Sequence, residues 1–276
     1  MAANQITLFD LPSQGRQSCW SLNPWKSKGS PHRLPPAACE LGIEYTLTDH
    51  SRTARINLNF KGVDYKTEWL EYPDIKPRLE KHVQLPEGQK TYTIPTVILP
   101  DGSYMTDSLA IAHKLEELYP EPKLAGIETP AFDRLSKDLL PGIMGDLRPV
   151  YFSRLPERVL NKASYEYWQT TRAEALGVGK RPDELTDADR GEAWKKLEES
   201  GKLKQVSALL NAQAENGPYF EGKEIGFADF AWTGFLVFWK RIGGDEYEKI
   251  LELTGDKDLH LKYLQKMEPH IKRDAF

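Results

Sequence analysis

Residues 92–109 decide the fold, and they read YTIPTVILPDGSYMTDSL. Apolar residues dominate Thr96–Leu99 and recur in Ser103–Thr106, as they do in short strands. Pro100-Asp101-Gly102 lies between these two runs, and this combination is typical of a tight turn. The stretch therefore predicts a β-hairpin, preceded by an Ile94-Pro95 step.

A helix is predicted immediately after the hairpin. Asp107 or Ser108 is suited to cap its first turn, because both side chains can accept hydrogen bonds from free backbone N–H groups. Apolar residues then recur at helical spacing through Leu118, and Pro120 ends the pattern. Taken alone, this Asp-Ser pair is a good helix cap and nothing more.

Two further strands are predicted upstream, at Ile6–Asp10 and from Val63 to Trp69. The first is a short apolar run, and in the second apolar and polar residues alternate. Together with the hairpin and the helix after it, these strands predict an α/β domain over residues 1–120.

The pattern changes after Pro120, where helical stretches dominate and no convincing strand is found. One helix is expected to start at the capping box Thr186–Asp189 and to continue through Leu210. The apolar and aromatic stretch Ile225–Gly243 predicts a central core helix. Residues 121–276 are therefore expected to form an all-α domain.

Composition and charge limit the classes of function that this chain can be expected to have. The chain has 276 residues, a net charge of −4 and two cysteines, Cys19 and Cys39. This charge gives no reason to expect a nucleic-acid surface, and no apolar run is long enough to span a membrane. The cysteines provide neither a disulfide framework nor typical metal-ligand spacing, so no metal site is predicted. Without a recognisable secretory leader, the chain is expected in the cytoplasm.

The first helix of the α/β domain is interrupted in the sequence. Asn23-Pro24 is a helix-opening pair, and Lys61-Gly62 is typical of a helix end with glycine in the left-handed position. Residues 27–53 lie between them and include two adjacent prolines and no helical period. Without this insert, Trp25, Ile56 and Phe60 would form one apolar stripe on a continuous helix.

A retained intron is the favoured origin of the insert, because Ser27-Lys28 and Thr53-Ala54 are compatible with splice donor and acceptor codons. Partial duplication is an alternative, since Gly42–Tyr45 is similar to Gly62–Tyr65. A lid loop over the active site is a third. If the insert is present in the physiological protein, it is expected to weaken or abolish ligand binding.

The combined features resemble a cytosolic glutathione S-transferase. Within that family the chain is most similar to the fungal etherase-related (FuA) class, which is similar in turn to bacterial lignin β-etherases. The resemblance covers nearly the whole chain. It is carried by WSLNPWK at 20–26, LNFKG at 58–62, TEWLEYPDI at 67–75, YTIP at 92–95 and DSL at 107–109.

The resemblance implies a thioredoxin-like N-terminal domain that binds glutathione as co-substrate, followed by an all-α substrate domain. It implies a cis bond at Ile94-Pro95, which lets the Ile94 backbone pair with the cysteine of glutathione. It also implies that Asp107 and Ser108 hold the γ-glutamyl group at a helix N-terminus. A homodimer and a role in detoxification are further implications.

Ser21 is the expected catalytic residue. Family members place a hydroxyl or thiol at the end of the first strand–helix loop, where a hydrogen bond favours the glutathione thiolate. Cys19 takes this role if the alignment is shifted, and Ser18 is also close. Asn23 can donate its amide to the sulfur while capping the helix.

A small, flat aromatic electrophile is expected between the domains. Its candidate walls are Tyr151, Phe152, Trp168 and Trp232, although aromatic residues at helical spacing also serve as ordinary core. The expected function is transfer of glutathione to such a molecule or cleavage of an aryl ether. The alternatives are a non-catalytic binder of aromatic compounds (a ligandin), a form inactivated by the insert, and an interaction protein without glutathione affinity.

Overall fold

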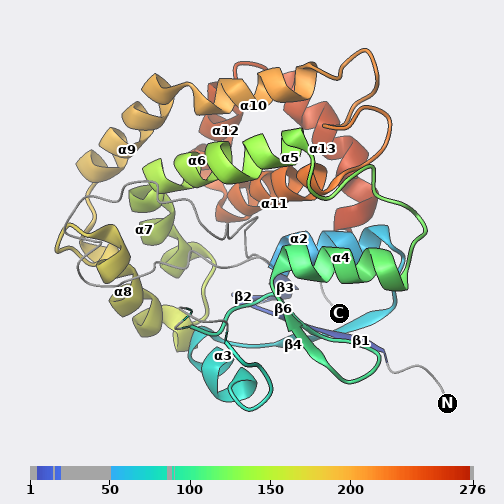
Figure 1. Ribbon diagram of the computed structural model, residues 1–276. Helices are drawn as coiled ribbons and strands as arrows, with labels where there is room; N and C mark the ends of the chain where they lie inside the picture. Colours follow the sequence, from blue (N-terminus) through green and yellow to red (C-terminus); the bar gives the residue numbers. More distant parts are fainter. Residues whose placement is uncertain (1–4, 15, 20–50, 86–88, 90, 274–276) are drawn as a thin grey trace.

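The computed structural model describes residues 5–14, 16–19, 51–85, 89 and 91–273. Its strands all lie within the first 106 residues, and its larger part is helical. In Figure 1 the sheet lies at the lower right, and the helical half lies above it and to its left.

One mixed sheet organises the first half. Its strand order is β4 (Tyr65–Trp69), β1 (Ile6–Asp10), β5 (Thr96–Ile98) and β6 (Tyr104–Thr106). β1 and β4 are parallel, whereas the β1–β5 and β5–β6 pairs are antiparallel. Parallel neighbours need a crossover connection, and here it contains α2 (Ser51–Phe60).

The two faces of the sheet bury different sets of side chains, because successive strand residues point to opposite faces. One face packs on α2 and on α4 (Ser108–Leu118), which follows the hairpin directly as predicted. This layer is built from Ile6, Leu8, Ala54, Leu58, Val97, Ile111 and Leu115.

The opposite face of the sheet is covered by α3 (Tyr72–Leu79). The Arg78 guanidinium lies 4.8 Å from the centre of the Phe9 ring and donates a hydrogen bond to the Tyr104 hydroxyl over 3.1 Å. The two covered faces confirm the predicted thioredoxin-like α/β arrangement.

A second, two-stranded sheet was not expected from the sequence. It pairs β2 (Pro12–Ser13) with β3 (Arg16–Cys19) in antiparallel orientation, directly after β1. Strands this short carry no alternating pattern, so the sequence offers no signal for them.

The second half is a helical array around α11 (Phe227–Ile242), whose residues are almost all buried. This confirms the predicted core helix. The other helices are α5 (Pro130–Arg134), the π-helical η1 (Leu135–Leu139), α6 (Leu140–Asp146), α7 (Arg148–Arg158), α8 (Lys162–Leu176), the 3₁₀ turn η2 (Pro182–Glu184), α9 (Asp187–Ser200), α10 (Lys202–Asn211), α12 (Gly244–Leu253) and α13 (Lys257–Ile271). No helix in the described part of the chain is long and apolar enough to cross a membrane.

One helix prediction is wrong. The helix expected from Thr186 through Leu210 is two helices, α9 and α10, which are separated by Gly201. Gly201 has φ +60°, the left-handed conformation in which glycine ends helices at low cost. The capping box itself is confirmed, since Asp189 N donates to Thr186 Oγ1 and the Asp189 carboxylate accepts from Thr186 N.

α2 begins at Ser51, inside the segment 27–53 that the sequence pattern predicts as an insert. Arg52 and Thr53 are buried in its first turn. The remainder of the insert, residues 27–50, lies outside the described residues. At the other end Gly62 has φ +63°, as predicted for the residue that terminates this helix.

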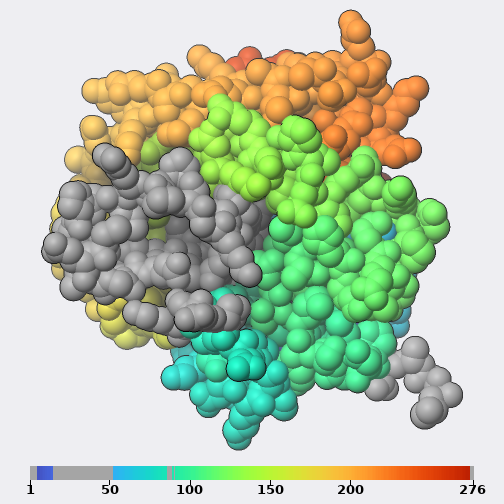
Figure 2. All heavy atoms as spheres, viewed as in Figure 1, coloured from blue at the N-terminus to red at the C-terminus, as the bar shows by residue number. Residues whose placement is uncertain are grey.

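The two halves pack directly against each other through α2. Phe60 lies edge-on to Phe230 of α11, with ring centres 5.5 Å apart. The Lys61 ammonium is buried, donates to the Pro122 carbonyl over 2.8 Å and pairs with Glu116. Both halves also contribute to the face shown in Figure 2, where α3 lies below the α5–α6 run.

Candidate functional site

The sheet register gathers four residues at one edge. Asp10, the last residue of β1, pairs with Trp69, the last residue of β4. On the other side of β1, Phe9 pairs with Thr96, the residue after Pro95. Thr96 pairs in turn with Thr106, the residue before Asp107. The two sequence elements predicted to bind one ligand therefore meet at the same edge as the carboxyl ends of both parallel strands.

The Ile94-Pro95 peptide bond is cis, as the resemblance implies. Ile94 is fully buried, and Thr96 Oγ1 donates to the Thr93 carbonyl over 2.8 Å. This turn leads directly into β5.

Asp107, rather than Ser108, is the N-cap of α4. Its Oδ1 accepts hydrogen bonds from the backbone N–H groups of Leu109 and Ala110, each over 3.0 Å. Its φ of +79° is unusual for a residue other than glycine. Within the described part of the chain Oδ2 accepts no hydrogen bond, so this oxygen can face a ligand. Ser108 follows in the first turn and is buried.

A buried ion pair lies beside this edge and was not predicted as part of the site. Arg55 donates from Nη2 and Nε to Asp10 Oδ2, over 2.7 and 3.0 Å, and neither side chain is more than 2% exposed. Asp10 Oδ1 accepts the backbone N–H of Leu11 over 2.8 Å. We call Asp10 and Arg55 the buried ion pair. A buried pair needs such additional bonds, because taking both charges out of water is costly.

Strand β4 also contributes to the surroundings of Arg55. Its guanidinium donates to Thr67 Oγ1 over 3.0 Å and to the Tyr65 hydroxyl over 3.4 Å. It also lies 5.2 Å from the centre of the Trp69 ring. The available signal in the sequence was Asp10 itself, a charged residue that closes an otherwise buried strand.

The predicted catalytic residue is not placed by the structure. Ser21 and Asn23 lie outside the described residues. For the alternatives Ser18 and Cys19 the backbone belongs to β3, and their side chains are not described.

Two family models match the chain along most of its length. The glutathione S-transferase N-terminal domain matches residues 49–118, and the glutathione S-transferase C-terminal domain matches residues 131–270. The chain belongs to the glutathione S-transferase family.

Individual relatives agree with this assignment. A glutathione S-transferase-like protein of Aspergillus flavus is 30% identical over 217 residues, which are 72% of this chain and 76% of that protein. Glutathione transferase GSTFuA3 from Phanerochaete chrysosporium has 25% identity and a TM-score of 0.74, over 99% of this chain and all of that one.

A glutathione S-transferase of Ceriporiopsis subvermispora, solved in complex with glutathione, is also similar. It has 25% identity and a TM-score of 0.72, over 97% of this chain and 98% of that one. The predicted resemblance to fungal FuA-class glutathione transferases is confirmed, and the chain is a glutathione S-transferase enzyme.

Three of the four aromatic residues predicted as pocket walls lie together in this glutathione S-transferase. The Tyr151 and Phe152 ring centres are 4.7 Å apart, and those of Phe152 and Trp168 are 5.6 Å apart. Trp168 Nε1 donates to the Phe152 carbonyl over 2.9 Å. Trp232 lies elsewhere, on α11, where it stacks on Phe235 and is fully buried.

The Tyr151 hydroxyl is buried and makes no hydrogen bond within the described residues. Burial outweighs the influence of the nearby Arg148 and raises the pKa of Tyr151 to about 12. The group therefore stays protonated near neutral pH and can only act there as a neutral donor or acceptor.

Trp168 connects these three rings to the thioredoxin-like half through α3. Trp168 lies 5.6 Å from Tyr72 between ring centres, and the Arg172 guanidinium lies 4.4 Å from the centre of the Trp168 ring. Glu71, just before α3, accepts hydrogen bonds from the Asn161 amide and the Ser164 hydroxyl. These contacts fix α8 against the half that contains the sheet edge.

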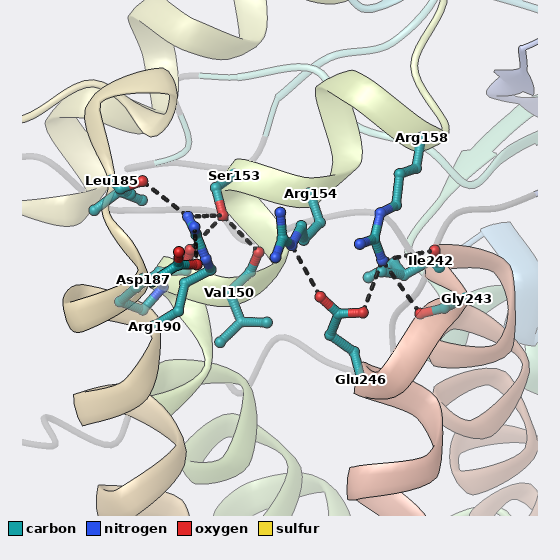
Figure 3. Close-up of polar contacts among 11 residues, drawn as sticks. Val150, Ser153, Arg154, Arg158, Leu185, Asp187, Arg190, Ile242, Gly243 and Glu246 are labelled. Atoms are coloured by element: carbon teal, nitrogen blue, oxygen red, sulfur yellow. Dashed lines mark hydrogen bonds and ion pairs between the residues drawn. The ribbon is translucent and has the colours of Figure 1, made fainter.

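Helix α7, which carries Tyr151 and Phe152, is also held by Glu246 of α12 (Figure 3). Arg154 Nε and Arg158 Nη1 donate to the two carboxylate oxygens of Glu246, over 2.9 and 2.7 Å. Burial tends to raise the pKa of Glu246, but the bonds from Arg158 and Arg154 outweigh it and lower this pKa. The carboxylate therefore stays ionised and holds α7 against α12.

A serine–histidine contact elsewhere in the enzyme is structural. His260 Nε2 lies 2.8 Å from Ser207 Oγ, while His260 Nδ1 accepts a hydrogen bond from Trp232 Nε1. Nε2 must then carry the proton, so His260 cannot act as a base towards Ser207. Among the described residues no cluster of His, Cys, Asp and Glu could hold a metal ion.

Proposed function

We propose that this glutathione S-transferase transfers glutathione to small aromatic electrophiles or cleaves aryl ethers, with Ser21 as the donor that stabilises the thiolate. The observation that carries the proposal is the sheet register, which brings Pro95 and Asp107 to one edge. A relative of similar fold has been solved with glutathione bound.

The proposed glutathione site has a cation-binding and an anion-binding part. Oδ2 of Asp107, which accepts no hydrogen bond from the described residues, suits the ammonium group of the γ-glutamyl residue. The N-terminus of α4, with Ser108 in its first turn, suits the carboxylate of the same residue. The backbone of Ile94, just before Pro95, is proposed to pair with the cysteine of glutathione, and Asn23 to contribute from the preceding loop.

The proposed role of Ser21 follows from thiol chemistry. A free cysteine thiol has a pKa of about 8.5, and the thiolate is the nucleophile. A hydroxyl that donates to the sulfur favours the charged form and therefore lowers this pKa. The thiolate attacks the electrophilic carbon, and the halide, nitrite or aryloxide leaves with the bonding electrons.

The electrophile is proposed to bind against Tyr151, Phe152 and Trp168. The three rings lie in consecutive contact, and Trp168 also contacts Tyr72 of α3. All three side chains are buried. Aromatic rings suit a flat, apolar molecule, and the buried Tyr151 hydroxyl, which has no partner among the described residues, is proposed to hydrogen-bond an oxygen substituent. A homodimer and a cytoplasmic location remain part of the proposal.

Turnover of 1-chloro-2,4-dinitrobenzene and of an aryl β-ether with glutathione tests this function. We expect activity that is strongly reduced in Ser21→Ala. A ligandin would instead show tryptophan quenching by aromatic compounds without turnover, and an interaction protein would show no retention on a glutathione column. Either result would contradict the proposal.

We also propose that residues 27–53 derive from a retained intron, whose last residues supply the first turn of α2. A variant that lacks 27–53 would replace Ser51–Thr53, the first turn of α2, with Pro24–Lys26 and join the two helix halves. We expect stronger retention of this variant on immobilised glutathione. A transcript without these 27 codons supports the intron origin, whereas genomic DNA without splice signals excludes it.

A further inference from the structure

The end of α13 is bound to the loop between α2 and β4. Arg273 donates from Nη1 to the Val63 carbonyl over 3.1 Å, and from Nη2 to the Tyr65 carbonyl over 2.7 Å and Asp64 Oδ1 over 3.1 Å. Asn59 Nδ2 donates to the Arg273 carbonyl over 3.1 Å. Residues more than 200 positions apart are thus joined by several directed bonds.

Tyr65 links this contact to the interior. The Arg273 guanidinium lies 4.2 Å from the centre of its ring, and the Arg55 guanidinium lies 5.6 Å from the same centre. Its hydroxyl donates to Asn59 Oδ1 over 2.8 Å and accepts from Arg55. The ring is almost fully buried, so its position is set by these partners.

The chain of contacts from Arg273 through Tyr65 ends at the buried ion pair. Arg55 holds Asp10, and Asp10 holds the N–H of Leu11, the first residue after β1. Phe9, the residue before Asp10, pairs with Thr96, the residue after Pro95, at the edge proposed to bind glutathione. A displacement of Tyr65 therefore changes the surroundings of a charge that lies directly beside this edge.

We propose that Arg273 and Tyr65 are positioning residues that hold the buried ion pair, and with it the carboxyl end of β1, in place for glutathione binding. This inference rests on the proposed function. The end of α13 then controls the affinity of the thioredoxin-like half for glutathione, although Arg273 contacts the α2–β4 loop rather than the edge itself.

Lysine cannot replace arginine in this arrangement. Arg273 uses two different guanidinium nitrogens for three acceptors while its plane stacks on Tyr65. An ammonium group is a compact charge without this planar fork, so it cannot reproduce both features. The inference therefore predicts that Arg273→Lys behaves like Arg273→Met.

The test compares Arg273→Met, Arg273→Lys and Tyr65→Phe with Lys272→Met. Lys272 is the adjacent residue, and its exposed side chain pairs only weakly with Glu268 over 3.6 Å. We expect both Arg273 variants and Tyr65→Phe to raise KM for glutathione about fivefold, a typical size for coupling between distant positions. KM for 1-chloro-2,4-dinitrobenzene should stay unchanged.

Hydrogen exchange provides a readout that does not need glutathione. We expect faster exchange of the Leu11 amide in Arg273→Met than in Lys272→Met at equal global stability. If the Leu11 amide exchanges equally fast in both variants, Arg273 only stabilises the fold and the inference is overturned. The inference is also overturned if KM for both substrates rises in parallel with lost stability. A wild-type enzyme that binds no glutathione would refute the proposed function separately, because the exchange comparison still reports on the link to Asp10.

Discussion

Trp232 donates a hydrogen bond from Nε1 to Nδ1 of His260, over 3.1 Å, in the interior of the helical half. His260 Nε2 continues this chain to Ser207, whose hydroxyl donates to the Thr254 carbonyl over 2.7 Å. Every step uses the neutral imidazole, so the core of this half depends on His260 remaining uncharged.

This dependence predicts how stability changes with pH. Burial lowers the pKa of His260 from 6.5 to about 4. Between these values the unfolded chain binds more protons at His260 than the folded one does, so the contribution of His260 to stability is complete above pH 6.5 and is lost as the pH falls towards 4. The loss is expected to reach about 3 kcal/mol. Burial raises the pKa of Asp229 to about 7, and this carboxyl contributes with the opposite sign in the same range.

Urea unfolding at pH 7.5, 5.5 and 4.5 measures this effect in the wild type, His260→Gln and His113→Gln. His113 is exposed and serves as control. We expect His260→Gln to flatten the pH dependence, while His113→Gln leaves it unchanged. An unchanged slope in His260→Gln would show that another group is responsible, and His270, whose pKa is also lowered by burial, would be the next to examine.

Asp107 is predicted to serve both the helix and the ligand, and two substitutions separate these roles. Asparagine can accept the same two backbone hydrogen bonds and tolerates positive φ, so Asp107→Asn should keep the free energy of unfolding. It removes the charge that faces the ligand ammonium, so KM for glutathione should rise about tenfold. Asp107→Ala should lose both, with a destabilisation of about 1 kcal/mol.

Unfolding and kinetic measurements on the same preparations test the assignment of Asp107. If Asp107→Asn binds glutathione as well as the wild type does, the residue is a helix cap and does not bind the γ-glutamyl group.

Tyr151 and Tyr263 are both buried tyrosines with different hydroxyl environments. The Tyr151 hydroxyl has no partner within the described residues, whereas the Tyr263 hydroxyl donates to the Asp229 carbonyl over 2.9 Å. We expect Tyr151→Phe to be stabilising by about 1 kcal/mol, and Tyr263→Phe to be destabilising by about 1–3 kcal/mol. Denaturant midpoints measure both changes.

The Tyr151→Phe and Tyr263→Phe variants also test the electrophile site. Tyr151→Phe should raise KM for nitro-substituted electrophiles and leave KM for glutathione unchanged, while Tyr263→Phe should affect neither. Equal KM values in Tyr151→Phe and the wild type would place Tyr151 in the ordinary core.

The sequence was sufficient for features that depend on local patterns. The turn Pro100-Asp101-Gly102 predicts the hairpin, and the apolar repeat after Asp107 predicts α4. The break between α9 and α10 was missed because the apolar positions continue on both sides of Gly201, although the glycine itself was a signal.

The interior of the site depends on contacts between distant positions and could not be predicted in this way. Asp10 meets Arg55 only when β1 and α2 pack together, and Tyr65 meets Arg273 only when the end of α13 returns to the α2–β4 loop. Periodicity reports which face of an element is buried, but it does not report which buried polar groups become partners.

The central claim is that the Ser21 hydroxyl stabilises the thiolate of bound glutathione, and an ultraviolet titration of that thiolate tests it most directly. Wild type, Ser21→Ala, Ser18→Ala and Cys19→Ala would be compared with glutathione bound. We expect the thiol pKa in the wild type to lie well below the about 8.5 of a free thiol, and to return towards that value only in Ser21→Ala. An unchanged thiol pKa in Ser21→Ala would contradict the account.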